Sequence, residues 1–311
     1  MRTVRTPPLV IGLCLLLLAA CTPRQPYPLP ERPDIPFGQG RLWKVDGAGI
    51  ETSYLFGTMH VDDKRVMDLP PEVEAAFAEA EIAAFEITAN SAADAGFEDV
   101  KRYRLPGDET LEDLIGARSV GILRWHMRRS DLLPRTNIKP WVFWEYLGGR
   151  NYGFVDYDHL EPSGEGKVLD DWLESRARIA GKEVVALESR QEQFDIYDKI
   201  PLDQQADMLK LTLEQYAETK PWVPKLQLYL DGDLAMFDAL WRQYLSQLQP
   251  GTAQTLEQRL IIDRNYVMVE RMLPLMRSRP TFVAVGAAHM AGEHGVLHLL
   301  ESRGYRVTRL R

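Results

Sequence analysis

From Gly40 onward, short apolar runs alternate with longer stretches whose apolar residues recur at helical spacing. This alternation is typical of an α/β protein, in which strands form a buried sheet and helices cover it. We expect strands at 41–45, 53–56, 82–85, 183–187, 282–285 and 305–310, and helices at 108–130, 168–180, 201–218, 233–247, 253–278 and 293–302, with a further helix starting within 69–72. The stretch 136–166, rich in glycine and aromatic residues, is expected to form a variable loop or cap.

The first residues of the chain have the composition of an export signal. Arg2 and Arg5 precede an unbroken apolar run over 9–20. That run is too short to cross a bilayer, which takes about 20 residues. It has the length of a signal-peptide core, roughly 7–15 residues. We therefore expect an exported protein.

The small residues before Cys21 resemble the lipobox of bacterial lipoproteins. We expect residues 1–20 to be removed and Cys21 to become the lipidated first residue, which anchors the chain to a bacterial membrane. In the alternative, an ordinary signal is cut at the same place and Cys21 has no role. Thr22, where aspartate would favour the inner membrane, predicts the periplasmic face of the outer membrane.

The expected mature chain begins with a tether. Residues 22–36 contain six prolines and predict an extended segment. We therefore divide the chain into the signal peptide 1–20, the lipidated cysteine and tether 21–39, and one domain over 40–311. Since the only other cysteine, Cys14, lies in the signal, no disulfide is expected.

The charge balance excludes one class of partner. Without the two arginines of the signal, 35 basic residues face 45 acidic ones. A chain with this acidic excess is unsuited to nucleic-acid binding, and it needs no charge-driven contact with anionic lipid.

Four of the expected strands end on a residue that can bind a metal or move a proton. The runs SYLFGTMH and FVAVGAAH end at His60 and His289, and the runs IAAFE and VVALE end at Glu86 and Glu188. In open α/β sheets, ligands bind at the carboxyl ends of the strands. These four side chains are therefore expected to converge although they lie far apart in the sequence.

The two histidines share a local frame, which is GTMH starting at Gly57 and GAAH starting at Gly286. Glycine at a strand end allows a tight turn and a close approach of the backbone to a ligand. The repetition indicates a paired site. A simpler interpretation stays open, in which the histidines are polar strand ends and the glutamates are salt-bridged.

Arg264 stands out in the helix expected at 253–278. It falls within an apolar face made by Leu256, Leu260, Ile261, Val267, Met268 and Met272. A guanidinium directed into a core is costly unless it is paired. It could form a structural ion pair with Glu86 or Glu188, or it could stabilise an oxyanion at the floor of a cleft.

Several segments resemble the TraB/GumN/TIKI superfamily, and in particular its bacterial GumN-like branch. In chain order they are LWKVDG with SYLFGTMHV, AEIAAFEIT, ARIAGKEVVALESRQEQFDIYDKIP, YLDGDLAMFDAL, LIIDRNYVMVERM and FVAVGAAHMAGEHGVLHLLESRGYRVTRL. The resemblance covers residues 41–311. It implies an α/β fold with a mixed central sheet flanked by helices, related to the erythromycin-esterase and ChaN-like folds.

The animal TIKI members of this superfamily are described as metal-dependent proteases that use both GxxH histidines and a glutamate. Carried over, the resemblance implies that His60, Glu86 and His289 hold a divalent metal, for which Zn, Mn, Fe and Co are suited. A Gly-Val-Asp of bacterial members is matched only loosely, at Asp170. Further motif positions fall on Glu188, Gln193, Arg264 and Asn265, with Gly57 and Gly286 as structural support.

These assignments predict a membrane-anchored, metal-dependent hydrolase that acts on peptides or signals in the bacterial envelope. The metal would lower the pKa of a bound water. Glu188 would accept its proton, and Arg264 would stabilise the oxyanion that forms.

Three alternatives remain. The protein could bind a peptide or signal without turnover, or it could hydrolyse small esters. A separate zinc site could form from His289, Glu293, His294 and His298, although their spacing matches neither HExxH nor HxxEH. Serine hydrolysis is disfavoured because the chain has no GxSxG motif.

Overall fold

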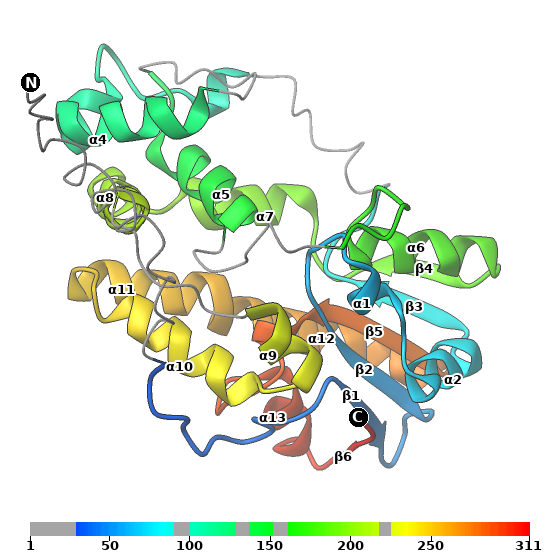
Figure 1. Ribbon diagram of the computed structural model, residues 1–311. Coiled ribbons are helices and arrows are strands. Elements are labelled where there is room, and N and C mark those ends of the chain that lie inside the picture. The colour runs from blue at the N-terminus through cyan, green and yellow to red at the C-terminus, as the bar shows by residue number, and fades with distance from the viewer. Residues whose placement is uncertain (1–28, 90–99, 129–136, 152–160, 218–224) are drawn as a thin grey trace, which may run out of the picture.

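The computed structural model describes residues 29–89, 100–128, 137–151, 161–217 and 225–311 (Figure 1). Its sheet has the strand order β4-β3-β5-β2-β1-β6. The strands are β1 (Leu42–Asp46), β2 (Ser53–Thr58), β3 (Ile82–Phe85), β4 (Glu183–Ala186), β5 (Thr281–Gly286) and β6 (Arg306–Arg309). Strands β4, β3, β5 and β2 run parallel to one another, whereas β1 is antiparallel to β2 and β6. The expected α/β fold with a mixed sheet is confirmed.

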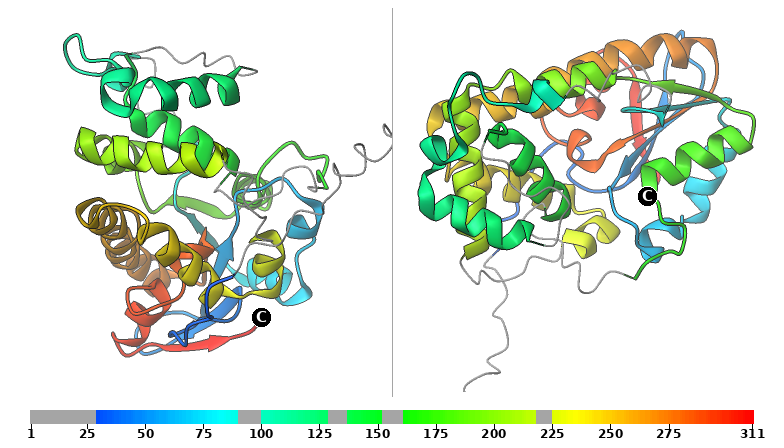
Figure 2. Two further views of the ribbon diagram at one scale, coloured as in Figure 1. Left: turned by 60° about the vertical axis from the view of Figure 1, so that its left-hand side comes forward. Right: turned by 90° about the horizontal axis from the view of Figure 1, so that it is seen from above.

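Helices cover both faces of this sheet (Figure 2). On one face lie α2 (Pro71–Glu79) and α6 (Leu169–Ile179), and on the other lie α12 (Asp263–Ser278) and α13 (Val296–Glu301). The short helix α1 (Lys64–Met67) follows the β2 strand end. Trp43, Phe56 and Phe282 are fully buried in the core between these layers. Their burial explains why the strand runs are almost continuously apolar.

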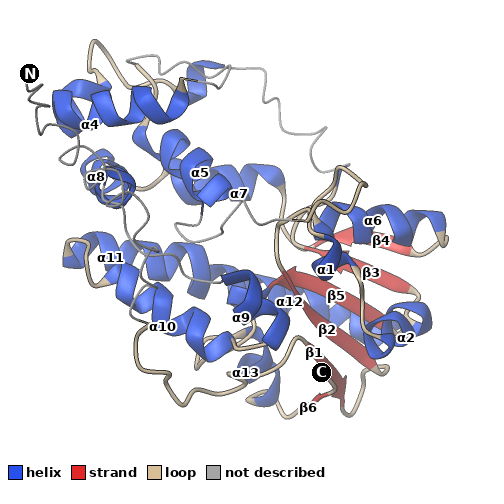
Figure 3. Cartoon of the chain, viewed as in Figure 1, coloured by secondary structure: helices blue, strands red, loops and turns tan. Residues whose placement is uncertain are grey.

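A second, purely helical layer lies beside the sheet (Figure 3). It contains the 3₁₀ turn η1 (Val100–Tyr103) and the helices α4 (Leu111–Met127), α5 (Pro140–Asn151), α7 (Arg190–Asp198), α8 (Leu202–Ala217) and α11 (Pro250–Leu256). Helices α9 (Lys225–Asp231) and α10 (Leu234–Leu245) lie between this layer and the sheet. Its core is separate from that of the sheet and includes Leu123, Leu209 and Leu256. We call this layer the cap.

The helix α5 corrects one expectation. Residues 136–166 were expected to form a variable loop or cap; residues 140–151 form a helix, whereas residues 136 and 152–160 lie outside the described residues. Trp141, Phe143 and Trp144 are instead buried in or beside the cap core, at 3%, 4% and 7% exposure. Tertiary burial of large aromatic surfaces outweighs the weak local preference.

One long helix joins the two cores. It consists of α11, the π-helical segment η3 (Glu257–Ile262) and α12. A π-helical turn contains an additional residue and shifts the phase of the residues that follow. Val267, expected on the apolar face, is therefore 38% exposed, and Val269 is buried in its place. Arg264 lies just after the π-helical segment, where the helix passes from the cap to the sheet.

The N-terminal end of the described chain packs against the folded body. Arg32 Nε lies 2.8 Å from Asp233 Oδ1, and Gly40 N donates to Gly232 O at 2.8 Å. Residues 32–39, which the sequence assigned to the tether, are therefore attached to the domain. Residues 1–28, with Cys21, lie outside the described residues. Among the helices that are described, none has the length and hydropathy needed to cross a membrane.

Candidate functional site

The parallel strands bring the predicted residues to one edge of the sheet. Thr58 of β2 is in register with Gly286 of β5, and Phe85 of β3 is in register with Ala284. His60, Glu86 and His289 follow the ends of these three strands, and Glu188 follows β4. The topology thus brings all four strand ends to one edge of the sheet, and the side chains of Glu86, Glu188 and His289 meet there at Arg264.

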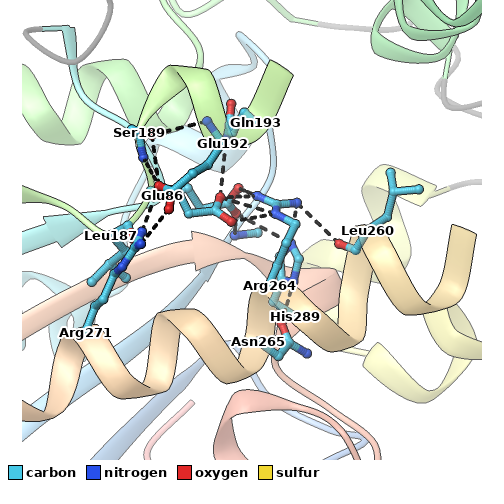
Figure 4. A network of polar contacts seen from close by, with 12 residues as sticks. Glu86, Leu187, Ser189, Glu192, Gln193, Leu260, Arg264, Asn265, Arg271 and His289 are labelled. Carbon is cyan, nitrogen blue, oxygen red and sulfur yellow. Dashed lines mark hydrogen bonds and ion pairs between the residues drawn. The ribbon is translucent and has the colours of Figure 1, made fainter. Parts of the chain in front are cut away.

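Arg264 holds three of these strand ends together (Figure 4). Its Nε and Nη2 contact both carboxylate oxygens of Glu188 at 2.7–3.2 Å, and Nη2 also donates to Glu86 Oε2 at 2.6 Å. Its Nη1 lies 3.1 Å from His289 Nε2 and 3.4 Å from Leu260 O. All five N–H groups of the guanidinium therefore have partners. The sequence left open whether Arg264 pairs with Glu86 or Glu188, and it pairs with both.

Burial and the charge of Arg264 shift the pKa values of both Glu86 and His289. Burial alone would raise the pKa of Glu86, but the guanidinium of Arg264 and the N–H of Gly286 hold that pKa well below its usual range. Burial and the same guanidinium lower the pKa of His289 to about 4. Around neutral pH, Glu86 is therefore ionised and His289 is neutral.

The neighbours of His289 define which ring nitrogen carries its proton. Asn265 is fully buried, and its side-chain N–H donates to His294 O at 2.7 Å. Its Oδ1 is therefore directed at His289 Nδ1, at 2.6 Å, and accepts the Nδ1–H hydrogen bond. This places the lone pair of the neutral imidazole on Nε2, the atom that faces Arg264.

The glycines of both GxxH frames lie at places of close packing. A Cβ at Gly57 would lie 3.2 Å from the backbone Cα of Ala287, in the other frame. A Cβ at Gly286 would lie 3.2 Å from Glu86 Oε1, which accepts the Gly286 N–H at 2.6 Å. The two frames therefore pack directly against each other.

His60 lies apart from the Arg264 network and is paired with Asp170, in the first turn of α6. Its Nδ1 is 2.6 Å from Asp170 Oδ2, and the Thr58 hydroxyl donates to Asp170 Oδ1 at 2.6 Å. The carboxylate of Asp170 raises the pKa of His60 to about 9. The sequence matched Asp170 only loosely, and the available signal was an aspartate in the first turn of a helix after a glycine-rich stretch.

We expect Asp170→Asn to lower the pKa of His60 toward the ordinary value of a histidine, about 6.5. The anionic partner is lost while the size of the side chain is kept. The His60 side chain is 60% exposed, so solvent screens this pair and its replacement should not unfold the protein. An NMR titration of the His60 ring measures the change, and Asp171→Asn, one position further along α6, should lower the pKa of His60 less, because the Asp171 carboxylate contributes less to it than that of Asp170. A His60 pKa unchanged in Asp170→Asn would show that this pair does not set it.

Tyr229 of α9, which the sequence did not single out, supports the first frame. Its hydroxyl donates to Gly57 O at 2.9 Å, while Gly57 N donates to Arg41 O at 2.9 Å. Tyr229 is fully buried, and the guanidinium of Arg41 lies 5.1 Å from the centre of its ring. Strand β1 begins only at Leu42, so Gly57 of β2 lies beyond the end of the β1–β2 pairing. The Tyr229 hydroxyl therefore supplies the donor for the Gly57 carbonyl.

We expect Tyr229→Phe to lower the free energy of unfolding by about 1–3 kcal/mol, because it leaves the buried Gly57 carbonyl without a donor. Chemical denaturation measures the loss. Tyr266→Phe is the matched control, since Tyr266 is 43% exposed and should change stability by less than about 0.5 kcal/mol. Equal effects of the two changes would contradict the supporting role of the Tyr229 hydroxyl.

Gln193 makes the remaining contact of the predicted set. It lies on α7, and its Nε2 is 3.4 Å from Glu188 Oε2, a long hydrogen bond. The alternative zinc site near His289 does not form in the described residues. There His294 is exposed, and His298 lies near Glu293 and Glu301 at 3.4 and 3.8 Å.

Whether these residues suit a divalent metal depends on the chemistry of the donors. Within the described ranges, no three His, Cys, Asp or Glu side chains are already grouped to hold a metal ion. The donors nevertheless fit one, because an oxygen atom faces Nδ1 of both His60 and His289, as is usual for metal-bound histidines. A metal at Nε2 of His289 requires Arg264 Nη1 to move away, since it contacts that atom at 3.1 Å.

Comparison with known proteins identifies relatives of the whole domain. A TIKI homologue from the sponge Amphimedon queenslandica, described as a metalloprotease, is 24% identical over 86% of this chain and 61% of its own length. The metalloprotease TIKI2 of Danio rerio is 26% identical over 86% of this chain and 60% of its own length. The chain thus spans about 60% of the length of these relatives. No solved structure shows a significant match.

The family model of the TraB/PrgY/gumN family matches residues 41–309, nearly the whole described domain. The resemblance that the GxxH frames indicated is therefore confirmed. The chain belongs to the TraB/PrgY/gumN family.

Proposed function

We propose that this protein is a metal-dependent hydrolase that cleaves peptides in the bacterial envelope. The observation that carries the proposal is the pair of GxxH frames on adjacent parallel strands, beside two buried carboxylates held by one arginine. The metalloprotease relatives support the same chemistry. In this proposal His60, His289 and Glu86 hold the metal, which is Zn, Mn, Fe or Co.

A bound divalent metal supplies a water whose pKa is lowered toward neutrality. Asp170 and Asn265 orient the two imidazoles by fixing Nδ1 of each ring. Glu188 would take the proton of the attacking water, in the role the sequence assigned to it, and would pass it to the amide nitrogen as the carbon–nitrogen bond of the substrate breaks. Its oxygens are held by Arg264 and Gln193, so proton transfer to Glu188 loosens its ion pair with Arg264. Arg264 N–H groups then become available to the negative charge that develops on the substrate carbonyl.

A peptide-library digest with and without chelator tests the proposal, with Glu188→Gln as the variant. Cleavage that needs both the metal and Glu188 supports it. Tight peptide binding without turnover would instead establish the protein as a receptor, and hydrolysis of small esters alone would make it an esterase. Either of these results would overturn peptide hydrolysis.

The proposed location follows from the N-terminal sequence. We place the domain at the periplasmic face of the outer membrane, held by lipid on Cys21, after removal of residues 1–20. This location would limit the substrates to peptides or signals that reach the vicinity of the membrane.

Cells fed radiolabelled palmitate should label the wild-type protein, whereas Cys21→Ser should abolish the label, because the thiol that accepts the lipid is lost. Cys14→Ser, inside the proposed signal, is the matched control and should still be labelled. Label retained in Cys21→Ser would contradict anchoring at this cysteine.

A further inference from the structure

The cap contains a cavity that is separate from the site described above. Its volume is about 400 Å³, within the range of small-molecule sites. It lies where α7 ends and α8 begins, and its lining includes none of the residues of the Arg264 network and not His60. The residues of its wall are Lys101, Arg104, Leu105, Pro106, Lys139, Asp198, Ile200, Leu202 and Gln205.

The polar part of this wall is positive, although the protein as a whole is acidic. Lys101, Arg104 and Lys139 face a single carboxylate, that of Asp198. Asp198 is already occupied, since its Oδ1 accepts from Lys139 Nζ at 2.6 Å and from the ring N–H of Trp141 at 3.3 Å. Asp198 is therefore engaged with Lys139, and Arg104 has no carboxylate partner among the described residues.

Lys139 has donors to spare. Its side chain is 17% exposed, and Asp198 is the one acceptor that its ammonium reaches within the described residues. An ammonium group has three N–H donors, and Asp198 accepts from one of them, so the others are available to a ligand. A ligand with acceptor oxygens in the cavity would satisfy them.

Arg104 is held in place by its backbone. It forms an antiparallel bridge with Ile138, and the flanking hydrogen bonds run from Leu105 N to Asn137 O at 2.9 Å and from Lys139 N to Tyr103 O at 2.8 Å. This short ribbon fixes Arg104 and Lys139 on the same cavity. The Arg104 side chain is exposed and makes no ion pair with any described residue. Its fork of N–H groups suits the two oxygens of a carboxylate.

The rest of the wall comes from the buried Gln205 and from four apolar residues, Leu105, Pro106, Ile200 and Leu202. Leu105 and Ile200 are already buried, whereas Pro106 is exposed and Leu202 is half-buried, so an apolar group attached to an anion would pack against the last two. We propose that this cavity is a binding site for a carboxylate attached to a short apolar group, such as the C-terminal residue of a peptide or a small free organic acid.

The position of the cavity relates it to the hydrolytic site. Helix α7 begins two residues after Glu188 and ends at Asp198 in the cavity wall. At 1.5 Å per residue, its nine residues separate the two by about 13 Å. An extended peptide covers that distance in about four residues. The cavity binding proposal itself does not depend on hydrolysis.

The test is a titration of the purified full chain by NMR with N-acetyl-leucine and with its uncharged amide, in the presence of a chelator so that no metal-dependent turnover takes place. The two probes differ only in the carboxylate. We expect the acid to bind at least about tenfold more tightly than the amide, since one charge-assisted hydrogen bond has about this effect. Equal binding of the two probes, or binding of neither, would overturn the proposal.

Arg104→Gln should abolish the preference for the acid. Because the Arg104 side chain is exposed, the variant should still fold, so misfolding would not explain the lost preference. Arg118→Gln, an equal change of charge on the exposed side of α4, is the control and should keep the preference. A preference retained in Arg104→Gln would identify a general charge effect and refute the site. If N-acetyl-Gly-Gly-Leu binds more tightly than N-acetyl-leucine, the ligand is the end of a peptide. If N-acetyl-leucine binds more tightly, the ligand is a free acid. Both results support the binding site.

Discussion

Replacement of Arg264 by leucine should destabilise the protein by about 3–5 kcal/mol, because it removes the shared partner of two buried carboxylates. Glu86 and Glu188 have side chains that are 10% and 3% exposed, so water cannot take the place of the guanidinium. The loss is measured as the free energy of unfolding in a chemical denaturation experiment.

Arg271→Leu is the matched control on the same helix. Arg271 pairs with Glu192, but its side chain is 41% exposed, and exposed pairs contribute about 0–1 kcal/mol. Adding Glu86→Gln and Glu188→Gln to Arg264→Leu should recover part of the lost stability, because the unpaired charges are removed. If Arg264→Leu destabilised the protein no more than Arg271→Leu, the Arg264 network would not contribute to stability as proposed.

His60→Ala should reduce metal-dependent peptide hydrolysis by more than about 100-fold while leaving the fold intact. Loss of a group that only orients a metal ligand typically costs about 10–100-fold, so loss of the proposed ligand should cost more. The 60% exposure of the His60 side chain limits the effect on stability. The rate of cleavage under subsaturating peptide, together with the melting temperature, measures both effects.

His126→Ala on α4 is the control for this change, because His126 belongs to the cap and not to a strand end. It should leave the rate of hydrolysis unchanged. A His60→Ala protein that cleaves peptides at the wild-type rate would remove His60 from the proposed site.

The sequence was sufficient to predict where the site residues gather. His60, Glu86, Glu188 and His289 each follow an apolar run, and parallel strands necessarily place such ends at one edge. Arg264 could be expected near them because a guanidinium on an apolar helix face needs a buried partner. These inferences rest on periodicity and on the cost of burying charge, which are properties of local sequence.

Other features depend on contacts that no local pattern reveals. Asp170 approaches His60 across 110 residues, and Tyr229 reaches Gly57 across 172. The π-helical segment before Arg264 changes which side chains face the core, so Val267 is exposed against expectation. Helix α5 forms because its aromatic side chains are buried in the cap. The free energy of that burial stabilises the helix only in the folded protein.

The central claim is that the paired GxxH frames bind a divalent metal. Elemental analysis of the purified full chain, compared with His60→Ala, tests it directly. We expect about one equivalent of Zn, Mn, Fe or Co in the wild-type protein and its loss in the variant. A wild-type protein that contains no such metal, binds none on addition and gains no activity from any of the four would contradict the claim.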